Sequence, residues 1–338
     1  MEKIRNNYID FLKGIGIILV ILGHHKNILT NWIYSFHMPL FFILSGVFHK
    51  NEESFFKFIK KKSKGLLVPY YVLSAILFVF WLVIGRKYGE SAINKTPIKE
   101  SFAGIFYGII RIKGVSSMEW GEPMWFLLCL FVVSTIFYFL CKLDLKKVIL
   151  IEIFLFFISI TSKKYIPIAL PWNIQRAFID IIFYSIGYYC RTFIKDQSSK
   201  KFFQIGIICL FVNLSIYFNN KYFKGLINYN IDLIYLIGGF FGSFAIINLF
   251  KVVKKNRIIE YLGKNTLILL AFHGRAMTFI KFIIIIILGN KLIEENLIID
   301  IWYSILQIFL CLPAIFIFNK CFPCLIGKEN KNLRNIKK

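Results

Sequence analysis

Charged residues are scarce in this chain of 338 residues. Only 18% of the residues are Asp, Glu, Lys or Arg, whereas 57% are hydrophobic and the mean hydropathy is +0.65. A soluble globular domain needs more polar surface than this composition supplies. The apolar residues, among them 38 phenylalanines, are spread over the whole length. The sequence therefore excludes a soluble globular protein and predicts an all-α polytopic membrane protein.

A paired set of cysteines is also lacking. The seven cysteines are odd in number and lie mostly within apolar stretches, which excludes a disulfide framework. Cys321 and Cys324 form a C-x-x-C, but neither a second pair nor a histidine lies near them. We interpret both as free cytosolic thiols, and we predict no metal site.

Familiar signatures of soluble enzymes are absent too. The sequence has no P-loop, G-x-S-x-G, H-E-x-x-H or H-R-D motif. Its net charge of +24 would suit nucleic acid in a soluble protein, but the lysines lie in short clusters between apolar segments. That pattern is typical of the positive-inside rule and of contact with anionic lipid headgroups. We therefore predict membrane lipid, and not nucleic acid, as a partner of these clusters.

Long apolar runs between the charged clusters predict about ten transmembrane helices. With the N-terminus in the cytosol, the cytosolic segments hold 26 of the 42 Lys and Arg, so both termini are expected there. We expect one transmembrane domain over residues 1–320 and a basic cytosolic tail over 321–338. The predicted spans are 9–28, 34–49, 66–85, 123–141, 148–162, 177–191, 203–218, 231–250, 262–288 and 298–319.

The first predicted span carries a polar stripe within "DFLKGIGIILVILGHHK", residues 10 to 26. Residues of a helix turn by about 100° each and rise by about 1.5 Å. Lys13 and His24 therefore differ by only about 20° around the axis, and Asp10 lies about 40° from His24. Because Lys13 and His24 are about 16 Å apart along the axis, they cannot form a hydrogen-bonded dyad. We interpret the stripe as a channel, with a cytosolic mouth at Asp10 and Lys13 and an imidazole deep inside.

His24 is the first candidate for chemistry. Ionisable residues inside a membrane are expensive to hold there, and a neutral imidazole can accept a proton. The alternative is a packed histidine bonded to a backbone carbonyl, or one at the outer interface. His25 points about 100° away from His24, and we interpret it as an interfacial anchor.

Three further histidines lie in predicted spans. His273 lies about 15 Å from the cytosolic end of its span, a depth similar to that of His24, and Arg275 follows it. His273 is a candidate for function, the alternative being an interhelical hydrogen bond. His37 begins the short second span and is another candidate. His49 ends that span on the cytosolic side, where we expect a solvated or interfacial side chain.

Four lysines precede the third predicted span in the stretch "FIKKKSKGLLVPYY", residues 58 to 71. Clustered ammonium groups at a membrane mouth suit phosphate binding. The alternative for each lysine is a role in topology and lipid contact.

Arg176 and Asp180 stand four residues apart at the outer end of the sixth predicted span. Side chains four apart on a helix are neighbours. We therefore expect an ion pair between them.

Five blocks of the sequence resemble the acyltransferase 3 family, most closely its fucose 4-O-acetylase-like bacterial sugar O-acetyltransferases. The resemblance runs in order from about residue 4 to at least residue 273. It implies about ten transmembrane helices in the bacterial cytoplasmic membrane. It also implies transfer of an acyl group, usually acetyl from acetyl-CoA, to a hydroxyl of a carbohydrate. The blocks are "YIDFLKGIGIILVILGH", "SFHMPLFFILSGVF", "FIKKKSKGLLVPYY", "MWFLLCLF" and "LGKNTLILLAFH".

The hallmark of that family is a basic residue and a histidine separated by ten residues, which maps to Lys13 and His24. The basic pair ahead of the family's L-x-P-Y maps to Lys61 and Lys64. Lysine stands at these positions where arginine is usual, which weakens a bidentate phosphate contact. The resemblance implies that these lysines hold the phosphates of acetyl-CoA while His24 acts as general base or acyl carrier. The remaining candidates are His273 as a second catalytic residue and Asp10, His37 and Arg275 as substrate-binding or structural polar residues.

A transporter or polysaccharide exporter without covalent chemistry is the rival reading. It also explains ten helices, a broken span and histidines within the membrane. It does not explain a cytosolic lysine cluster aligned with a histidine stripe, or the ordered family blocks. We therefore expect an acyl-CoA donor and a carbohydrate acceptor, on a glycan or a lipid-linked sugar.

Overall fold

The computed structural model of the protein is almost entirely helical. It describes residues 7–25, 27–52, 54–88, 96–112, 114–166, 169–195, 200–222, 231–253, 256–288 and 296–328. Within these residues the strands are β1 (Arg111–Ile112) and β2 (Ser116–Ser117), an antiparallel pair in which Arg111 lies opposite Ser117. The all-α prediction is therefore confirmed. Residues 329–338 of the predicted tail lie outside the described residues.

Six helical stretches in the described part of the chain are long and apolar enough to cross a membrane, which supports a multi-pass membrane protein. Each falls on one of the ten predicted spans. The stretches are Phe55–Gly85, Glu122–Leu140, Lys201–Phe218, Leu233–Val252, Thr266–Ile284 and Leu297–Cys321.

The other four predicted spans are helical but shorter or more charged. The helices α1 (Asn7–Gly23), α3 (His37–Gly46) and α11 (Ile174–Tyr189) have 17, 10 and 16 residues. α10 (Leu145–Tyr165) is long enough, but it carries Glu152 in its interior and lysines at both ends. Ten spans with both termini in the cytosol therefore stays a prediction.

The remaining elements connect or extend these helices. The longest apolar stretch is continuous but contains two π-helical turns, which widen the helix locally. It consists of α4 (Phe55–Lys62), η1 (Ser63–Leu67), α5 (Val68–Phe80), η2 (Trp81–Gly85) and then α6 (Arg86–Tyr88). The others are α2 (Thr30–Tyr34), α8 (Ile98–Tyr107), η3 (Glu122–Met124), α9 (Trp125–Leu140), η4 (Pro171–Asn173), α12 (Arg191–Lys195), α13 (Lys200–Tyr222), α14 (Ile231–Leu249), η5 (Phe250–Val252), α15 (Arg257–Lys264), α16 (Thr266–Leu288), α17 (Leu297–Cys321) and η6 (Pro323–Ile326).

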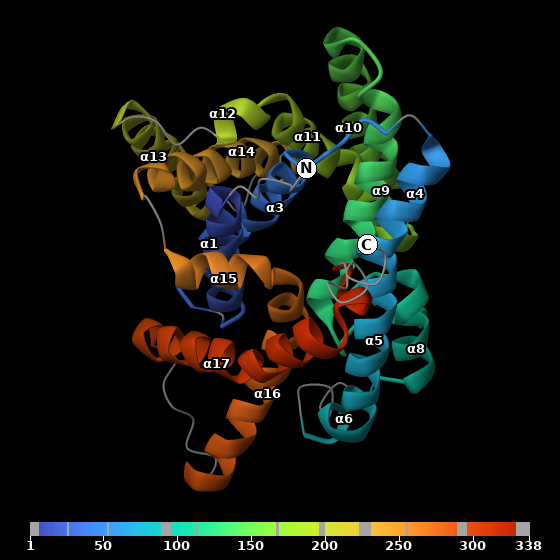
Figure 1. Ribbon diagram of the computed structural model, residues 1–338, viewed down its shortest axis with the longest axis vertical. Coiled ribbons are helices and arrows are strands. Elements are labelled where there is room, and N and C mark those ends of the chain that lie inside the picture. Colours follow the sequence, from blue (N-terminus) through green and yellow to red (C-terminus); the bar gives the residue numbers. More distant parts are fainter. Residues whose placement is uncertain are drawn as a thin grey trace, which may run out of the picture.

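The helix α1 lies in the middle of the molecule, packed against α15 and α3 (Figure 1). Glycines bring these helices into close contact, as small residues do between membrane helices. A side chain at Gly263 would meet the backbone oxygen of Asp10, and one at Gly14 would meet that of Ile259. The helices α3 and α11 approach each other in the same way, through Gly46 and Gly187. The contacts with α15 fix the position of the N-terminal half of α1.

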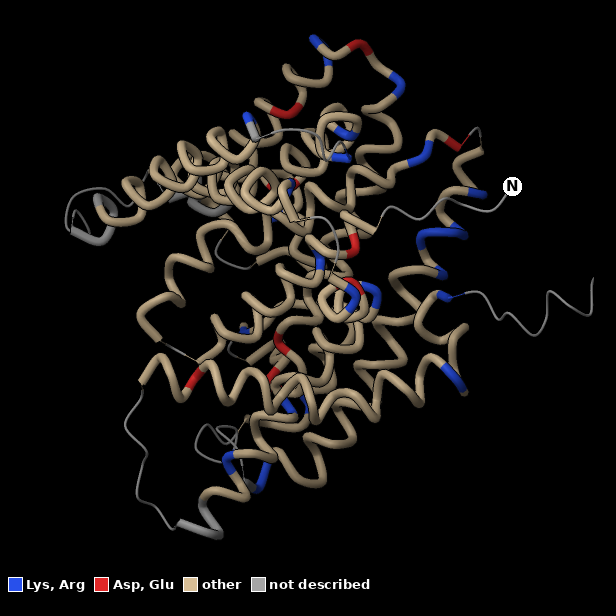
Figure 2. The backbone as a smooth tube through the Cα atoms, turned by 60° about the vertical axis from the view of Figure 1, so that its left-hand side comes forward, with Lys and Arg blue, Asp and Glu red and all other residues tan. Residues whose placement is uncertain are grey.

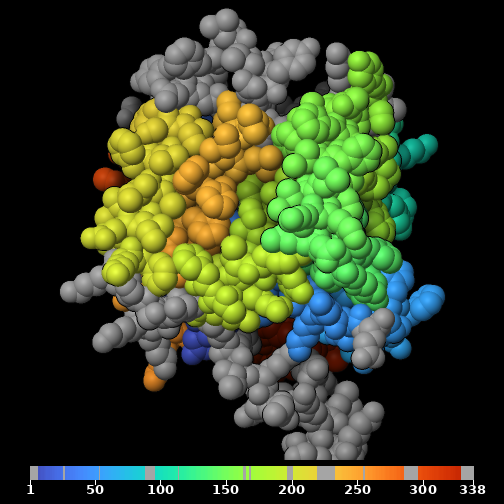
Figure 3. Space-filling model, turned by 90° about the horizontal axis from the view of Figure 1, so that it is seen from above, coloured from blue at the N-terminus to red at the C-terminus, as the bar shows by residue number. Residues whose placement is uncertain are grey.

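The outer helices present apolar side chains to their surroundings. α13 and α14 lie side by side, and together with α10, α11 and α12 they form one face of the molecule (Figure 3). Phe154, Phe157, Ile208 and Phe211 on this part of the surface are more than half exposed, as expected of side chains that contact lipid. Lys and Arg gather toward helix ends and connections, and long helical stretches carry no charge (Figure 2).

Candidate active site

His24 follows the last residue of α1 and keeps its side chain accessible. Its Nδ1 lies 2.7 Å from the backbone oxygen of Val20, one turn earlier. Because a carbonyl oxygen only accepts, Nδ1 carries the hydrogen in this contact and donates it. The lone pair of the neutral ring is therefore on Nε2. Such a nitrogen can take a proton from a hydroxyl group or attack an electrophile.

His273 and His37 are held in the same way. Nδ1 of His273 lies 2.8 Å from the oxygen of Leu269 in α16, and Nδ1 of His37 lies 3.0 Å from that of Ile33. His273 is 1% exposed, and its Nε2 has no hydrogen-bond partner among the described residues. All three histidines thus direct Nδ1–H to their own backbone and leave Nε2 as an acceptor.

His24 connects the other two histidines, since it contacts His273 directly and His37 through Tyr34, at the end of α2. The ring centroids of His24 and His273 are 5.0 Å apart, and the two rings meet edge to face. The ring centroid of Tyr34 lies 5.9 Å from that of His24 and 5.0 Å from that of His37. The expectation that His273 reaches the depth of His24 is confirmed. Tyr34 was not predicted, because nothing in the periodicity of its short helix marks it.

The lysine end of α1 is separate from this histidine cluster. The ammonium group of Lys13 lies over the ring of Phe48, 4.7 Å from its centroid. Lys61 pairs with Glu52, and this hydrogen bond lowers the pKa of the Glu52 carboxyl. Lys64 is exposed in η1. The three predicted phosphate ligands are therefore presented by different elements, with the half-buried Lys13 the most enclosed of them.

Asp10 and Arg275 have positions that favour structural roles. Asp10 is 5% exposed, and its backbone oxygen lies against Gly263 of α15. Arg275 donates from Nη2 to the backbone oxygen of Glu119, at 2.9 Å. It thereby ties the segment before η3 to α16.

Two predictions about histidines were wrong. His25 is buried rather than interfacial, with Nδ1 3.8 Å from Oδ1 of Asp300 and its ring stacked near Tyr303 of α17. His49 is 3% exposed rather than solvated, and its Nδ1 lies 3.0 Å from the hydroxyl of Tyr184. In both cases a distant helix supplies a polar and aromatic partner, which offsets the free-energy cost of burying the imidazole.

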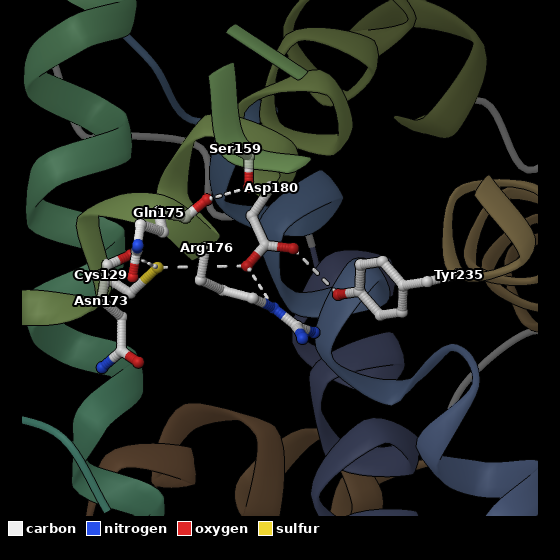
Figure 4. A network of polar contacts seen from close by, with 7 residues as sticks. All are labelled: Cys129, Ser159, Asn173, Gln175, Arg176, Asp180 and Tyr235. Atoms are coloured by element: carbon white, nitrogen blue, oxygen red, sulfur yellow. Dashed lines mark hydrogen bonds and ion pairs between the residues drawn. The ribbon is translucent and has the colours of Figure 1, made fainter. Parts of the chain in front are cut away.

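The predicted ion pair of Arg176 and Asp180 is confirmed, with 3.1 Å between Nε and Oδ2. Figure 4 shows that it belongs to a larger polar network, in which the Tyr235 hydroxyl donates to Oδ1 of Asp180 at 2.9 Å. The helices that carry Arg176 and Tyr235, α11 and α14, both pack against α3, which begins at His37, so the network adjoins the histidine cluster. Tyr235, on α14, was missed because its partner is far away in the sequence.

The described residues contain no candidate metal site. Within them no group of three His, Cys, Asp or Glu side chains lies close enough together to hold an ion. The seven cysteines, all of them described, are free. The chemistry that the histidine cluster itself presents is that of imidazole, with Nε2 of His24 held as an acceptor.

Comparison with known proteins places the chain. No curated protein and no solved structure matches it. The acyltransferase domain family named acyltransferase 3 matches residues 6–320, nearly the whole chain. The matched region contains every residue of the histidine cluster and the predicted phosphate ligands. The chain therefore belongs to the acyltransferase 3 family of membrane acyltransferases.

Proposed function

We propose that the protein transfers an acetyl or other acyl group from acyl-CoA to a hydroxyl of a cell-surface carbohydrate or its lipid-linked precursor. The observation that carries this proposal is the accessible Nε2 of His24, whose acceptor character follows from the contact of Nδ1 with Val20. Membership of an acyltransferase family supplies the reaction class. The protein would act in the bacterial cytoplasmic membrane with both termini in the cytosol.

The donor would enter from the end of the bundle that carries the lysines. Lys13, Lys61 and Lys64 would attract the phosphates of acyl-CoA, and the pantetheine arm would thread along α1 toward His24. The length of α1 supports this arrangement, because Lys13 and His24 stand about 16 Å apart along its axis. The thioester would then reach the imidazole while the nucleotide stays at the cytosolic mouth.

Two routes use the same imidazole. In the direct route, Nε2 of His24 takes the proton of the acceptor hydroxyl, the oxygen attacks the thioester carbonyl, and the proton passes to the departing CoA thiolate. In the carrier route, Nε2 attacks the thioester itself, CoA leaves, and the acyl-imidazole passes its acyl group to the acceptor oxygen. The second half of the carrier route needs another base, and the unpartnered Nε2 of His273 is suited to that role.

Transport without covalent chemistry is not favoured. Histidines within the membrane would also suit a transporter, but the chain belongs to a family of acyltransferases. The experiment that tests the proposal is transfer of labelled acetyl from acetyl-CoA to a glycan acceptor by the purified protein. Loss of transfer on replacing His24 supports it, and undiminished transfer contradicts it.

A further inference from the structure

Arg176 is a charged side chain beside the histidine cluster that the proposed mechanism does not use. It lies in the first turn of α11, and 36% of its side chain is exposed. The helix α11 packs against α3, which begins at His37, and Tyr34 lies near both His37 and His24. A ligand held by this guanidinium would therefore lie near the imidazole that we assign to proton or acyl transfer.

Asp180 fixes the orientation of Arg176. The Asp180 side chain is completely buried, and its two oxygens accept from Arg176 Nε and from the Tyr235 hydroxyl. Since Nε faces the carboxylate, the terminal Nη groups point away from it, as Figure 4 shows. A carboxylate committed in this way serves to aim the guanidinium and not to bind a ligand.

Two aromatic rings flank the guanidinium. The Cζ atom of Arg176 lies 4.2 Å from the ring centroid of Tyr235 and 5.9 Å from that of Trp125. The terminal edge of an arginine offers parallel N–H donors that suit two adjacent acceptor oxygens. Aromatic faces beside it suit the apolar faces of a sugar ring. Donors and rings together match a pyranose with vicinal hydroxyls better than they match a lipid chain or a simple ion.

The local charges indicate which kind of sugar fits. The positive charge of Arg176 is balanced by the adjacent Asp180. A further carboxylate, Glu122, lies in η3, which packs against α16, the helix that carries His273. An acidic sugar would therefore meet no net positive charge here.

We propose that Arg176, aimed by Asp180 and flanked by Trp125 and Tyr235, binds an uncharged sugar of the acceptor through vicinal hydroxyl oxygens. The inference rests on the proposed function for the role of that sugar as acyl acceptor. It names the group that holds the acceptor and the class of sugar that is accepted.

Binding can be measured without turnover, by saturation-transfer NMR or equilibrium dialysis on the full-length protein in nanodiscs. The probes are methyl glycosides of galactose, glucose, mannose and fucose, with the matching uronides of the first three. We expect a neutral glycoside to bind the wild type, with no tighter binding of its uronide. R176Q and R176K should both raise Kd at least about tenfold, because lysine keeps the charge but loses the paired donors.

Several controls separate folding and function from this site. R191K is the matched control, since Arg191 also stacks on a tyrosine, Tyr188, at 4.8 Å but is exposed at the start of α12, beyond the far end of α11. Acetyl-CoA binding and thermal unfolding verify that each variant folds. Trp125→Leu gives a second route to the same answer, because it removes one ring without changing charge, and it should also raise Kd.

Each outcome of these experiments either supports or contradicts the proposal. Absence of binding by every glycoside, unchanged Kd in R176Q and Trp125→Leu, or preference for a uronide that R176K preserves would each overturn the proposal. Glycoside binding that depends on Arg176 but no acetyl transfer would support it and count against the proposed function. Acetyl transfer that is independent of Arg176 would do the reverse.

Discussion

The imidazole of His273 meets that of His24 edge to face, with 5.0 Å between the ring centroids. Each ring donates from Nδ1 to its own helix, so both present the basic nitrogen Nε2. His24 is accessible, whereas His273 is buried and its Nε2 is unpartnered within the described part of the chain. The pair therefore consists of an accessible imidazole, which can contact substrates, and a buried imidazole, which can act as a base beside it.

Replacing His24 should abolish most of the activity. A positioned proton acceptor contributes a factor of about 10² to 10⁴ to the rate, so H24A should lower kcat by a factor within this range or by more. Binding of acetyl-CoA should change little, because Lys13 lies at the other end of α1 and Lys61 and Lys64 lie on other elements. Initial rates of labelled acetyl transfer and equilibrium binding of acetyl-CoA check this, with thermal unfolding as the control for folding. A variant that keeps normal transfer would remove His24 from the mechanism.

His273 distinguishes the two routes. In the carrier route, H273A should still form an acyl-enzyme from acetyl-CoA but should pass the acyl group on about 10²-fold more slowly. In the direct route no acyl-enzyme forms in either protein. Rapid quench with labelled acetyl-CoA, followed by mass spectrometry of the peptide that contains His24, measures directly whether an acyl-enzyme forms. If the carrier route holds, H273A accumulates acyl-His24 in the presence of acceptor, whereas the wild type accumulates it only without acceptor.

Lys13 should matter for the donor and not for the acceptor. K13A should raise KM for acetyl-CoA about tenfold, the effect of losing one charge-assisted contact, with a smaller change in kcat. K13R should preserve donor binding, because the guanidinium keeps the charge and adds paired donors. K142A is the matched control, since Lys142 also lies over an aromatic ring, that of Tyr138, at 4.0 Å. Equal effects of K13A and K142A on KM would reduce Lys13 to a general electrostatic role.

The periodicity of the first span predicted the two ends of α1 well. Rotation by about 100° per residue aligned Lys13 with His24, and the structure places these residues against Phe48 after α3 and Tyr34 before it. The helix itself ends at Gly23, and His24 is the first residue of the turn that follows. The repeat of the helix thus predicted where its polar residues, Lys13 and His24, lie.

Contacts between distant helices could not be predicted in the same way. The burial of His25 depends on Asp300, and that of His49 depends on Tyr184, and no local pattern joins these pairs. The placement of Tyr235 beside Arg176 depends equally on packing of α14 against its neighbours. Periodicity reports which face of a helix is buried, but the identity of the facing residue is a property of the tertiary structure.

The close contact between α1 and α15 predicts a strong effect of one methyl group. An added Cβ at Gly263 would lie 1.6 Å from the backbone oxygen of Asp10, so G263A must push the two helices apart. Overpacking of this kind costs about 1–3 kcal/mol, and here it would also shift the helix that positions Lys13 and His24. We expect a lower unfolding temperature in detergent together with a loss of transfer activity.

The control for this prediction is Gly274, which lies inside α16, where no other part of the described chain beyond the adjoining helix backbone comes within 4 Å of an added Cβ. G274A should be neutral or stabilising by up to about 1 kcal/mol, because alanine favours a helix over glycine. Thermal unfolding of both variants, in the presence and absence of acetyl-CoA, measures the difference. If G263A and G274A unfold at the same temperature as the wild type, then α1 is not held by α15 through its backbone. The positioning of His24 would then have to come from its neighbours in the histidine cluster.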